Sequence, residues 1–397
     1  MNDNNDKMKY FLPTYEEARA ICDAYDDFQF YETVRFIDGY KVSCFNYRLV
    51  GYSDFINPLP DRPEINASEL RGLCYVFNLD GTLFARYILM HKFFNVNENP
   101  GTQLDVLKDI SIKSVEEKLD GSIITFIRLP NGKVYAKSKM VLDSDQAIAA
   151  QEIYESNINI QLCVETALDF GLIPIFEYVS PSNRIVLKYL KSNLILLQIR
   201  DNSSGEYLDI ESFLKRFDLN IGINCPEMLP YKTWDEILPL RDTVVDKEGW
   251  IITLENGMML KYKTTWYCAL HRLMSESIHR EDFLIEKVVN DEIDDLVATI
   301  EVTDTETLEL ITNIQDKVVK YLKDIVYDVD SKLEVFKVQY SGNVKNFCLG
   351  EPNSKIKTFA LIVINGRDSV LNVVKKDLLQ RTYHLQAARK FLSTGLL

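Results

Sequence analysis

The chain has 397 residues and a mass of 45.9 kDa, which is too long for one ordinary globular core and predicts two domains. Its composition, 46% hydrophobic and 26% charged with only 16 glycines and 12 prolines, excludes a disordered, collagen-like or mucin-like protein. The net charge of −14 does not exclude a polyanionic partner, because the acidic residues are concentrated in one part of the chain.

The first two-thirds of the sequence predicts an antiparallel α+β domain, because its strand-like runs do not alternate regularly with helices. The expected elements are helices over 14–25 and 144–170 and strands over Tyr40–Tyr47, Leu70–Asn78, Ile123–Arg128, Lys133–Ala136, Pro174–Tyr178, Leu194–Arg200, Trp250–Leu254 and Met258–Lys263. Asn131-Gly132 and Asn256-Gly257 each lie between two of these runs and predict tight hairpins.

After about residue 268 the apolar residues recur at helical spacing, as in Ile311, Ile314, Val318, Leu322 and Ile325. We therefore expect one domain over residues 1–268 and a mostly α-helical domain over residues 269–397. Residues 281–310 carry eleven acidic and one basic residue, whereas residues 311–397 carry fourteen basic and eight acidic residues. The chain thus ends in a basic segment, which includes Lys375, Lys376, Arg381, Arg389 and Lys390.

Neither a membrane partner nor a bound zinc ion is expected. No apolar run approaches the roughly 18 residues of a membrane helix, and the first residues lack the pattern of a signal peptide, which predicts a cytoplasmic protein. The seven cysteines are scattered with no CxxC spacing and are expected to be reduced, and the four histidines are dispersed. Any chemistry must therefore come from Lys, Asp, Glu and Arg.

Lys118 is the candidate nucleophile. It belongs to the segment Glu117–Ser122, reading EKLDGS, just before a strand-forming run. A solvent-exposed lysine beside an Asp-Gly turn is an equally good interpretation of this segment alone. A lysine amine that is held on a tight turn near other cations loses its proton more easily and can attack phosphorus.

Other charged residues lie within or at the end of strand-like runs further along the chain. They are Glu177, Glu248, Lys261 and Lys263. Alternation along a strand places Lys261 and Lys263 on one face, where two ammonium groups suit the charge of a triphosphate. Each of these residues taken singly is more simply a solvated charge, but the four together in this order are difficult to attribute to chance.

This order of elements resembles the covalent nucleotidyltransferase superfamily, which includes ATP-dependent ligases and mRNA capping enzymes, and it is especially similar to the phage RNA ligase 1 family. Further segments that carry the resemblance are FNYRLVGYSDF (Phe45–Phe55), ELRG (Glu69–Gly72), HKFFNVNE (His91–Glu98) and AKSKM (Ala136–Met140). The resemblance covers roughly Tyr40 to Leu296. Phe45 stands where the family has a tyrosine, and Met140 stands where it has a glycine.

The resemblance implies a set of site residues. Lys118 would be adenylylated by ATP, Glu177 would bind the ribose hydroxyls, and Glu248 would contact the nucleotide and a Mg²⁺ or Mn²⁺ ion. The remaining implied residues are Phe45, Arg71, Lys92, Lys261 and Lys263 for cofactor binding, Lys139 and Tyr267 for ligation, and Asp294 for metal binding.

The implied activity is an ATP-dependent RNA ligase that joins 3′-hydroxyl and 5′-phosphate ends through lysyl-AMP and AMP-capped RNA. Its expected partner is nicked tRNA, which the helical domain would recognise, and its expected state is a monomer in the cytoplasm, of the host cell if a virus encodes it. The alternatives are a DNA ligase or capping guanylyltransferase, which would usually add a β-barrel instead of a helical domain. A non-catalytic nucleotide-binding or RNA-binding protein is a further alternative, against which the complete set of charged residues argues.

Overall fold

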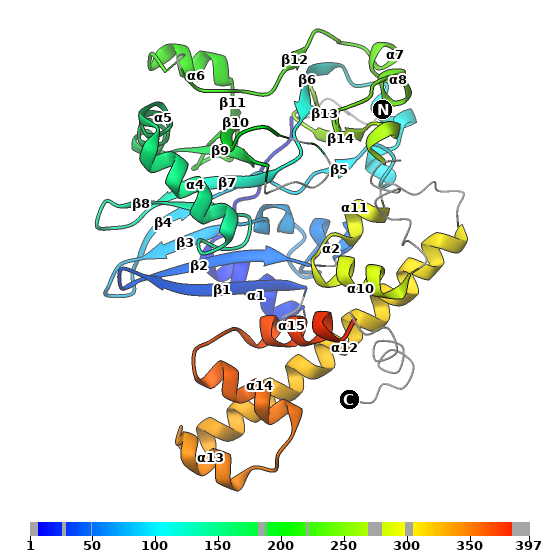
Figure 1. Cartoon of the computed structure of the whole chain (residues 1–397). Helices are drawn as coiled ribbons and strands as arrows, with labels where there is room; N and C mark the ends of the chain where they lie inside the picture. Colours follow the sequence, from blue (N-terminus) through cyan, green and yellow to red (C-terminus); the bar gives the residue numbers. More distant parts are fainter. Residues whose placement is uncertain are drawn as a thin grey trace. The chain divides into compact units, whose positions relative to one another are not determined.

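The computed structural model describes residues 7–25, 29–48, 50–181, 187, 189–219, 222–268, 280–297 and 305–382. The chain divides into two compact units, Met1–Leu270 and His271–Leu397 (Figure 1). The first unit combines antiparallel sheets with helices and the second is helical, as the sequence predicts. No helix in the described part of the chain is both long and apolar enough to cross a membrane. Arg389 and Lys390 of the basic segment lie outside the described residues.

The described residues of the first unit form three sheets. The first has the order β1(Phe30–Ile37), β2(Tyr40–Tyr47), β3(Cys74–Phe77) and β4(Leu83–Tyr87). The second has the order β11(Tyr207–Leu208), β10(Asn193–Asp201), β9(Leu172–Val179), β7(Ser122–Arg128) and β8(Val134–Ser138). The third has the order β12(Met228–Leu229), β6(Ile112–Lys118), β13(Gly249–Leu254), β14(Met259–Lys263) and β5(Phe94–Asn95), and only its β14–β5 pair is parallel.

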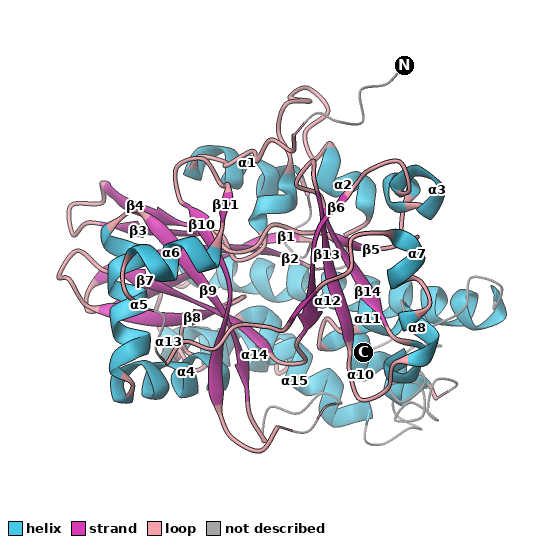
Figure 2. Cartoon of the chain, turned by 90° about the horizontal axis from the view of Figure 1, so that it is seen from above, coloured by secondary structure: helices cyan, strands magenta, loops and turns pink. Residues whose placement is uncertain are grey.

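Helices cover these sheets. The Tyr15 side chain of α1(Tyr15–Ala24) packs against Phe45 and Tyr75 of the first sheet, while α4(Asp145–Ser156) and α5(Ile158–Asp169) lie beside the second sheet (Figure 2). The shorter helices are α2(Tyr52–Ile56), α3(Leu104–Leu107), α6(Ile210–Arg216), α7(Trp234–Ile237), α8(Leu240–Thr243) and the 3₁₀ turns η1(Ala67–Leu70) and η2(Pro100–Thr102).

Both predicted hairpins are confirmed. Asn131-Gly132 joins β7 to β8 and Asn256-Gly257 joins β13 to β14, with both glycines at positive φ as such turns require. The sequence did not reveal β1, β4 or β6. Strands β1 and β4 pair with their neighbours β2 and β3, whereas β6 pairs with β12 and β13, more than a hundred residues further along the chain. This omission matters most for Lys118, which is the last residue of β6 and not part of the turn that follows it.

The described part of the second unit is helical throughout. It comprises α10(Glu281–Val289), α11(Ile293–Val297), α12(Thr305–Val338), α13(Val344–Gly350), α14(Lys355–Ile364) and α15(Val370–Thr382). The apolar residues predicted for one helical stripe, from Ile311 to Ile325, are buried along α12 where α10, α14 and α15 pack against it. This packing explains why the stripe has helical periodicity.

Candidate active site

Three charged residues meet at the ends of three adjacent strands. Gly249, at the start of β13, is paired with Lys118 of β6 on one side and with Lys263 of β14 on the other. Glu248 precedes it, and its Oε1 atom lies 2.6 Å from Lys118 Nζ and 3.5 Å from Lys263 Nζ. Glu248 is buried, and among the described residues its second oxygen, Oε2, has no hydrogen-bond partner. One carboxylate thus bridges two lysines and leaves one oxygen available.

Gly249 is required at this position for steric reasons. A Cβ atom there would lie 2.2 Å from the carbonyl oxygen of Tyr262 and 2.6 Å from Cα of Lys263. Any larger residue would force β13 and β14 apart. Because the two strands carry Glu248 and Lys263 to the same point, such a shift would also separate these side chains.

Glu177 lies in β9, which pairs with β7, the strand that begins at the last residue of the EKLDGS segment. Its pKa is raised to about 8, chiefly by burial, while the nearby Lys118 charge opposes the shift and the Glu248 charge adds to it. Gly121 allows the close approach, since a Cβ atom there would lie 2.4 Å from the carbonyl oxygen of Tyr178. Burial therefore favours the protonated carboxyl, which can both donate and accept a hydrogen bond.

Asp120 anchors the turn that follows Lys118. Its carboxylate accepts hydrogen bonds from the Tyr267 hydroxyl at 3.1 Å and from the Leu187 N–H at 2.7 Å, and its own N–H donates to the Tyr189 hydroxyl at 3.1 Å. Tyr267 is buried, and Lys263 Nζ lies 5.4 Å from the centre of its ring. Tyr267 therefore contacts both the turn and a site lysine, which gives it a structural role beside the one that the sequence implies.

Aromatic rings surround two further predicted cations. Lys92 Nζ lies 5.6 Å from the ring centre of Tyr47, 5.4 Å from that of Phe55 and 5.0 Å from that of Phe94. Lys261 Nζ lies 5.4 Å from the ring centre of Phe93. Such rings orient an ammonium group without neutralising its charge, so the lysines can still attract phosphate.

Arg71 and Lys139 lie near the same end of the first sheet. An Arg71 Nη1–H donates to the Met90 carbonyl at 3.4 Å, and the Arg71 charge lowers the pKa of Glu177, which places the two residues near each other. Lys139 Nζ lies 4.9 Å from the Tyr47 ring, and the Lys139 carbonyl accepts a hydrogen bond from Asn46 at 2.8 Å. Tyr47 thus contacts both Lys92 and Lys139.

Two further predicted site residues have other surroundings within their own units. The Phe45 side chain is fully buried and packs edge-on against Tyr15 and Tyr75 in the core beneath α1. Asp294 is an exposed residue of α11 in the second unit. A tyrosine hydroxyl would have to be buried at the Phe45 position, which explains why an apolar ring suits it here.

The donor set suits a magnesium ion bound together with a nucleotide. Mg²⁺ keeps several waters and usually takes one or two carboxylates plus phosphate oxygens from the protein and the substrate. Glu248 Oε2 is a buried acceptor without a partner, as such a ligand would be in the free protein. The described residues contain no group of three or more histidine, cysteine, aspartate and glutamate side chains that would form a self-sufficient metal site.

Three contributors to the site were not predicted as such. Asp120 and Tyr189 hold the turn, and Tyr47 lies between two lysines. The Asp-Gly pair in EKLDGS was a local indication of Asp120. Tyr47 lies in the family-like segment Phe45–Phe55, but nothing there indicated its contact with the two lysines. Tyr189 had no indication in the sequence, because only the fold brings it to Asp120, 69 positions away.

Comparison with known proteins identifies the family of the chain. The sequence profile of the family described as RNA ligase matches residues 69–267, half of the chain, and the chain belongs to this RNA ligase family. A putative RNA ligase of Thermovibrio ammonificans is 27% identical over 325 residues, which are 80% of this chain and 78% of that protein. The family match favours an RNA ligase over a DNA ligase, a capping enzyme or a protein without catalysis.

Solved structures of RNA ligases are also similar. A mutant Naegleria gruberi RNA ligase with AMP and Mn is 20% identical with a TM-score of 0.38, and the match covers 46% of this chain and 58% of that chain. An archaeal ATP-dependent RNA ligase is 12% identical with a TM-score of 0.43, covering 74% of this chain and 76% of that chain. The chain thus spans less than two-thirds of the Naegleria protein.

Proposed function

We propose that this RNA ligase joins the 3′-hydroxyl and 5′-phosphate ends of RNA with ATP as co-substrate and Lys118 as the nucleophile. The observation that carries the proposal is the contact of 2.6 Å between Lys118 Nζ and Glu248 Oε1, at the end of a strand beside Lys263. The amine is thereby oriented at a point where cations and a partly unpaired carboxylate meet. This arrangement suits attack on a phosphate group that is held by the same cations.

In the first step, Lys118 loses a proton and its nitrogen attacks the α-phosphorus of ATP. The new N–P bond replaces the bond to the bridging oxygen, and pyrophosphate leaves. Lys261 and Lys263 would stabilise the negative charge on the phosphate oxygens, together with Arg71 and Lys92. A bound Mg²⁺ or Mn²⁺ would supply further charge neutralisation, with Glu248 as its protein ligand.

The second and third steps transfer AMP to RNA and then release it. The 5′-phosphate of RNA attacks the lysyl-AMP, which restores the Lys118 amine and gives an AMP-capped end. The 3′-hydroxyl then attacks that end, forms the phosphodiester and releases AMP. Lys139 and Tyr267 would act in this final joining, and the neutral Glu177 carboxyl would bind the ribose hydroxyls of the nucleotide.

We further propose that the substrate is a nicked tRNA, that the monomeric ligase acts in the cytoplasm, and that the helical unit supplies affinity for folded RNA. The basic excess of residues 311–397 supports this division between the units. Lysines on a helical surface bind phosphates without reading base sequence, so they would favour large folded RNA over short strands. Asp294 of α11 would provide a metal contact within this helical unit.

Incubation of the protein with α-labelled ATP and a divalent metal, followed by a denaturing gel, tests the nucleophile. We expect a covalent label in the wild type and none in Lys118→Ala or Lys118→Arg, since arginine stays protonated with a pKa of about 12 or more. Labelling should be faster at alkaline pH, because only the neutral amine attacks, and stronger with ATP than with GTP. A label that persists in Lys118→Ala would disprove the assignment.

A further inference from the structure

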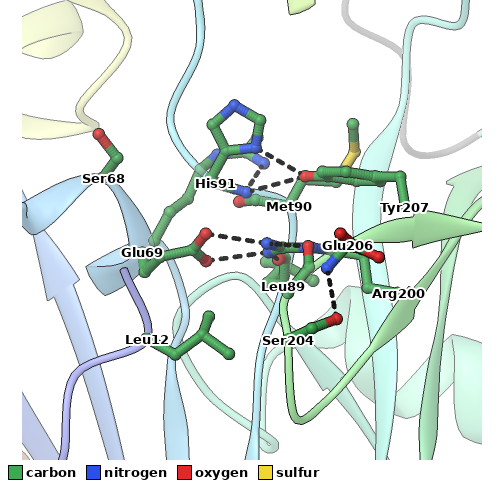
Figure 3. A network of polar contacts seen from close by, with 12 residues as sticks. Leu12, Ser68, Glu69, Leu89, Met90, His91, Arg200, Ser204, Glu206 and Tyr207 are labelled. Carbon is green, nitrogen blue, oxygen red and sulfur yellow. Dashed lines mark hydrogen bonds and ion pairs between the residues drawn. The ribbon is translucent and has the colours of Figure 1, made fainter. Parts of the chain in front are cut away.

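The first unit contains a buried ion pair near the proposed phosphate-binding residues. Arg200 of β10 is fully buried, and Glu69 of η1 is almost fully buried. Arg200 Nη1 donates to Glu69 Oε2 at 2.9 Å and Nη2 donates to Oε1 at 2.8 Å, so the contact is bidentate (Figure 3). The two residues are 131 positions apart in the sequence. The pair therefore joins two distant segments of the first unit.

Every N–H of the Arg200 guanidinium has an acceptor. Besides the two bonds to Glu69, Nε and Nη2 donate to the Gly205 carbonyl at 2.9 and 2.7 Å, and Nη1 donates to the Leu89 carbonyl. A guanidinium has five N–H groups in a fixed planar arrangement, so five bonds define its position and orientation completely. Arg200 thus holds three chain segments, around residues 69, 89 and 205, in fixed relative positions.

Aromatic residues and a histidine enclose this ion pair. The guanidinium carbon lies 4.5 Å from the Tyr207 ring centre and 5.1 Å from the Tyr10 ring centre. The Tyr207 hydroxyl accepts a hydrogen bond from the backbone N–H of His91 at 3.2 Å and lies 2.8 Å from the ring nitrogen Nδ1 of the same residue (Figure 3). Burial, together with the charges of Arg200 and Arg71, holds the pKa of His91 well below its ordinary value, so the imidazole is neutral.

The segments that Arg200 holds are those that carry two proposed phosphate-binding cations. Glu69 is two residues before Arg71, and Leu89 is three residues before Lys92. The same two segments are joined to each other, since the Lys92 N–H donates to the Ser68 carbonyl at 2.8 Å and Arg71 donates to a carbonyl of the other segment. The Arg71 charge lowers the pKa of both His91, beside the ion pair, and Glu177, in the proposed nucleotide site.

We propose that Arg200 is a positioning residue that sets the separation of Arg71 and Lys92 for the β- and γ-phosphates of ATP and for pyrophosphate. The inference rests on the proposed function, in which these two cations contact the triphosphate. A polyphosphate needs its cations at a defined spacing, and a displacement of about 1 Å in a binding group can reduce the rate by about 100-fold. Arg200 makes no contact with the reacting atoms and acts only through the two segments.

The test uses the full-length Arg200→Lys variant, because lysine keeps the charge but cannot make the bidentate contact and the three carbonyl bonds. We expect KM for ATP in self-adenylylation to rise by about 10- to 100-fold. The pyrophosphate concentration that half-maximally discharges the adenylylated enzyme should rise by a similar factor. Sealing of chemically pre-adenylylated RNA should change by less than about twofold, because this step involves no triphosphate.

Three further variants make the result decisive. When Arg200→Lys is added to the double variant Arg71→Ala with Lys92→Ala, the KM for ATP should rise little further, because the effects of residues that act through one another are not additive. The double substitution Glu69→Met with Arg200→Met removes both buried charges and keeps the test possible if the single variant does not fold. Arg128→Lys is the matched control, since Arg128 also pairs with two carboxylates, Glu165 and Asp169, and its KM should not change.

Two outcomes would overturn the inference. If sealing of pre-adenylylated RNA falls by the same factor as self-adenylylation, Arg200 only maintains the fold. If a folded Arg200→Lys variant keeps the wild-type KM for ATP and the wild-type response to pyrophosphate, the position of the two cations does not depend on it. Absence of lysyl-AMP in the wild type would instead disprove the proposed function, and the inference with it.

Discussion

The first unit contains two buried carboxylates that face cations, and they differ in how far their hydrogen bonds are satisfied. Glu69 uses both oxygens on Arg200, whose five N–H groups all have acceptors. Glu248 uses one oxygen for Lys118 and Lys263, and its other oxygen has no hydrogen-bond partner in the described part of the chain. In the first ion pair both carboxylate oxygens are hydrogen-bonded, whereas in the second, within the described residues, only one is.

This difference separates a structural ion pair from a site that can bind a ligand. A fully satisfied buried pair gains nothing from a further ligand and loses much when one member is removed. A buried oxygen without a partner already lacks a hydrogen bond, which a metal ion, a water molecule or a nucleotide could provide. The comparison predicts that loss of Glu69 chiefly lowers stability and, through the positions of Arg71 and Lys92, the affinity for ATP, whereas loss of Glu248 chiefly lowers the rate of self-adenylylation.

The largest expected effect is the loss of activity in Glu248→Gln. The amide removes the negative charge that orients Lys118 and would bind a metal, so self-adenylylation should fall by about 100- to 1,000-fold. Its Oε1 atom can still accept hydrogen bonds from both lysines and Lys118 remains partly exposed to water, so the loss of unfolding free energy should be smaller than in Glu69→Gln. Labelling with α-labelled ATP and urea unfolding measure the two quantities. If Glu248→Gln is labelled normally, the Glu248 carboxylate is not needed for self-adenylylation.

Glu69→Gln should lose chiefly stability. It leaves Arg200 buried without a counter-charge, which costs about 3–5 kcal/mol of unfolding free energy. Urea unfolding of Glu69→Gln and Glu248→Gln under the same conditions compares the free energies of unfolding that the two carboxylates of the first unit contribute. The distinction between the two carboxylates would be wrong if both variants lost the same stability.

The pH dependence of stability sharpens the comparison at Glu177. Its folded pKa of about 8 exceeds the ordinary value of 4.5, so the folded state retains a proton that the unfolded chain loses first. The stability it contributes is fully present below about pH 4.5 and is lost as the pH rises through about 8. Glu177→Gln imitates the protonated carboxyl, so it should match the wild type at pH 4.5 and exceed its stability at pH 8.5, by a few kcal/mol at most. Urea midpoints at the two pH values measure this, and equal midpoints at both would contradict it.

The smallest effect is expected from exposed lysines of the helical unit. Replacing Lys337, Lys345 and Lys376 by serine should weaken sealing of a nicked tRNA stem-loop by about 3- to 10-fold at low salt, and sealing of a short linear oligonucleotide less. The difference should shrink at high salt, because screening weakens the same contacts. The matched control replaces three exposed lysines of the first unit, Lys108, Lys133 and Lys232. Equal losses on both substrates would remove the proposed role in substrate choice.

Local sequence patterns determined several features by themselves. The hairpins at Asn131-Gly132 and Asn256-Gly257 follow from residues that tolerate positive φ, and the helical unit follows from apolar residues at helical spacing. The membership of the RNA ligase family was also readable, because its charged segments recur in a fixed order along the chain. These features depend on neighbours in sequence or on order alone.

The tertiary structure decided which of these charges meet and how completely they are paired. Strand β6, which carries Lys118, has a mixed polar sequence and exists because β12 and β13 pair with it. Arg200 was only the end of a predicted strand, and nothing near it in the sequence indicated Glu69. Phe45 belonged to a family segment, yet the packing of α1 on the first sheet buries it in the core. Hydrogen-bond satisfaction depends on contacts between residues more than a hundred positions apart, and no local periodicity encodes such contacts.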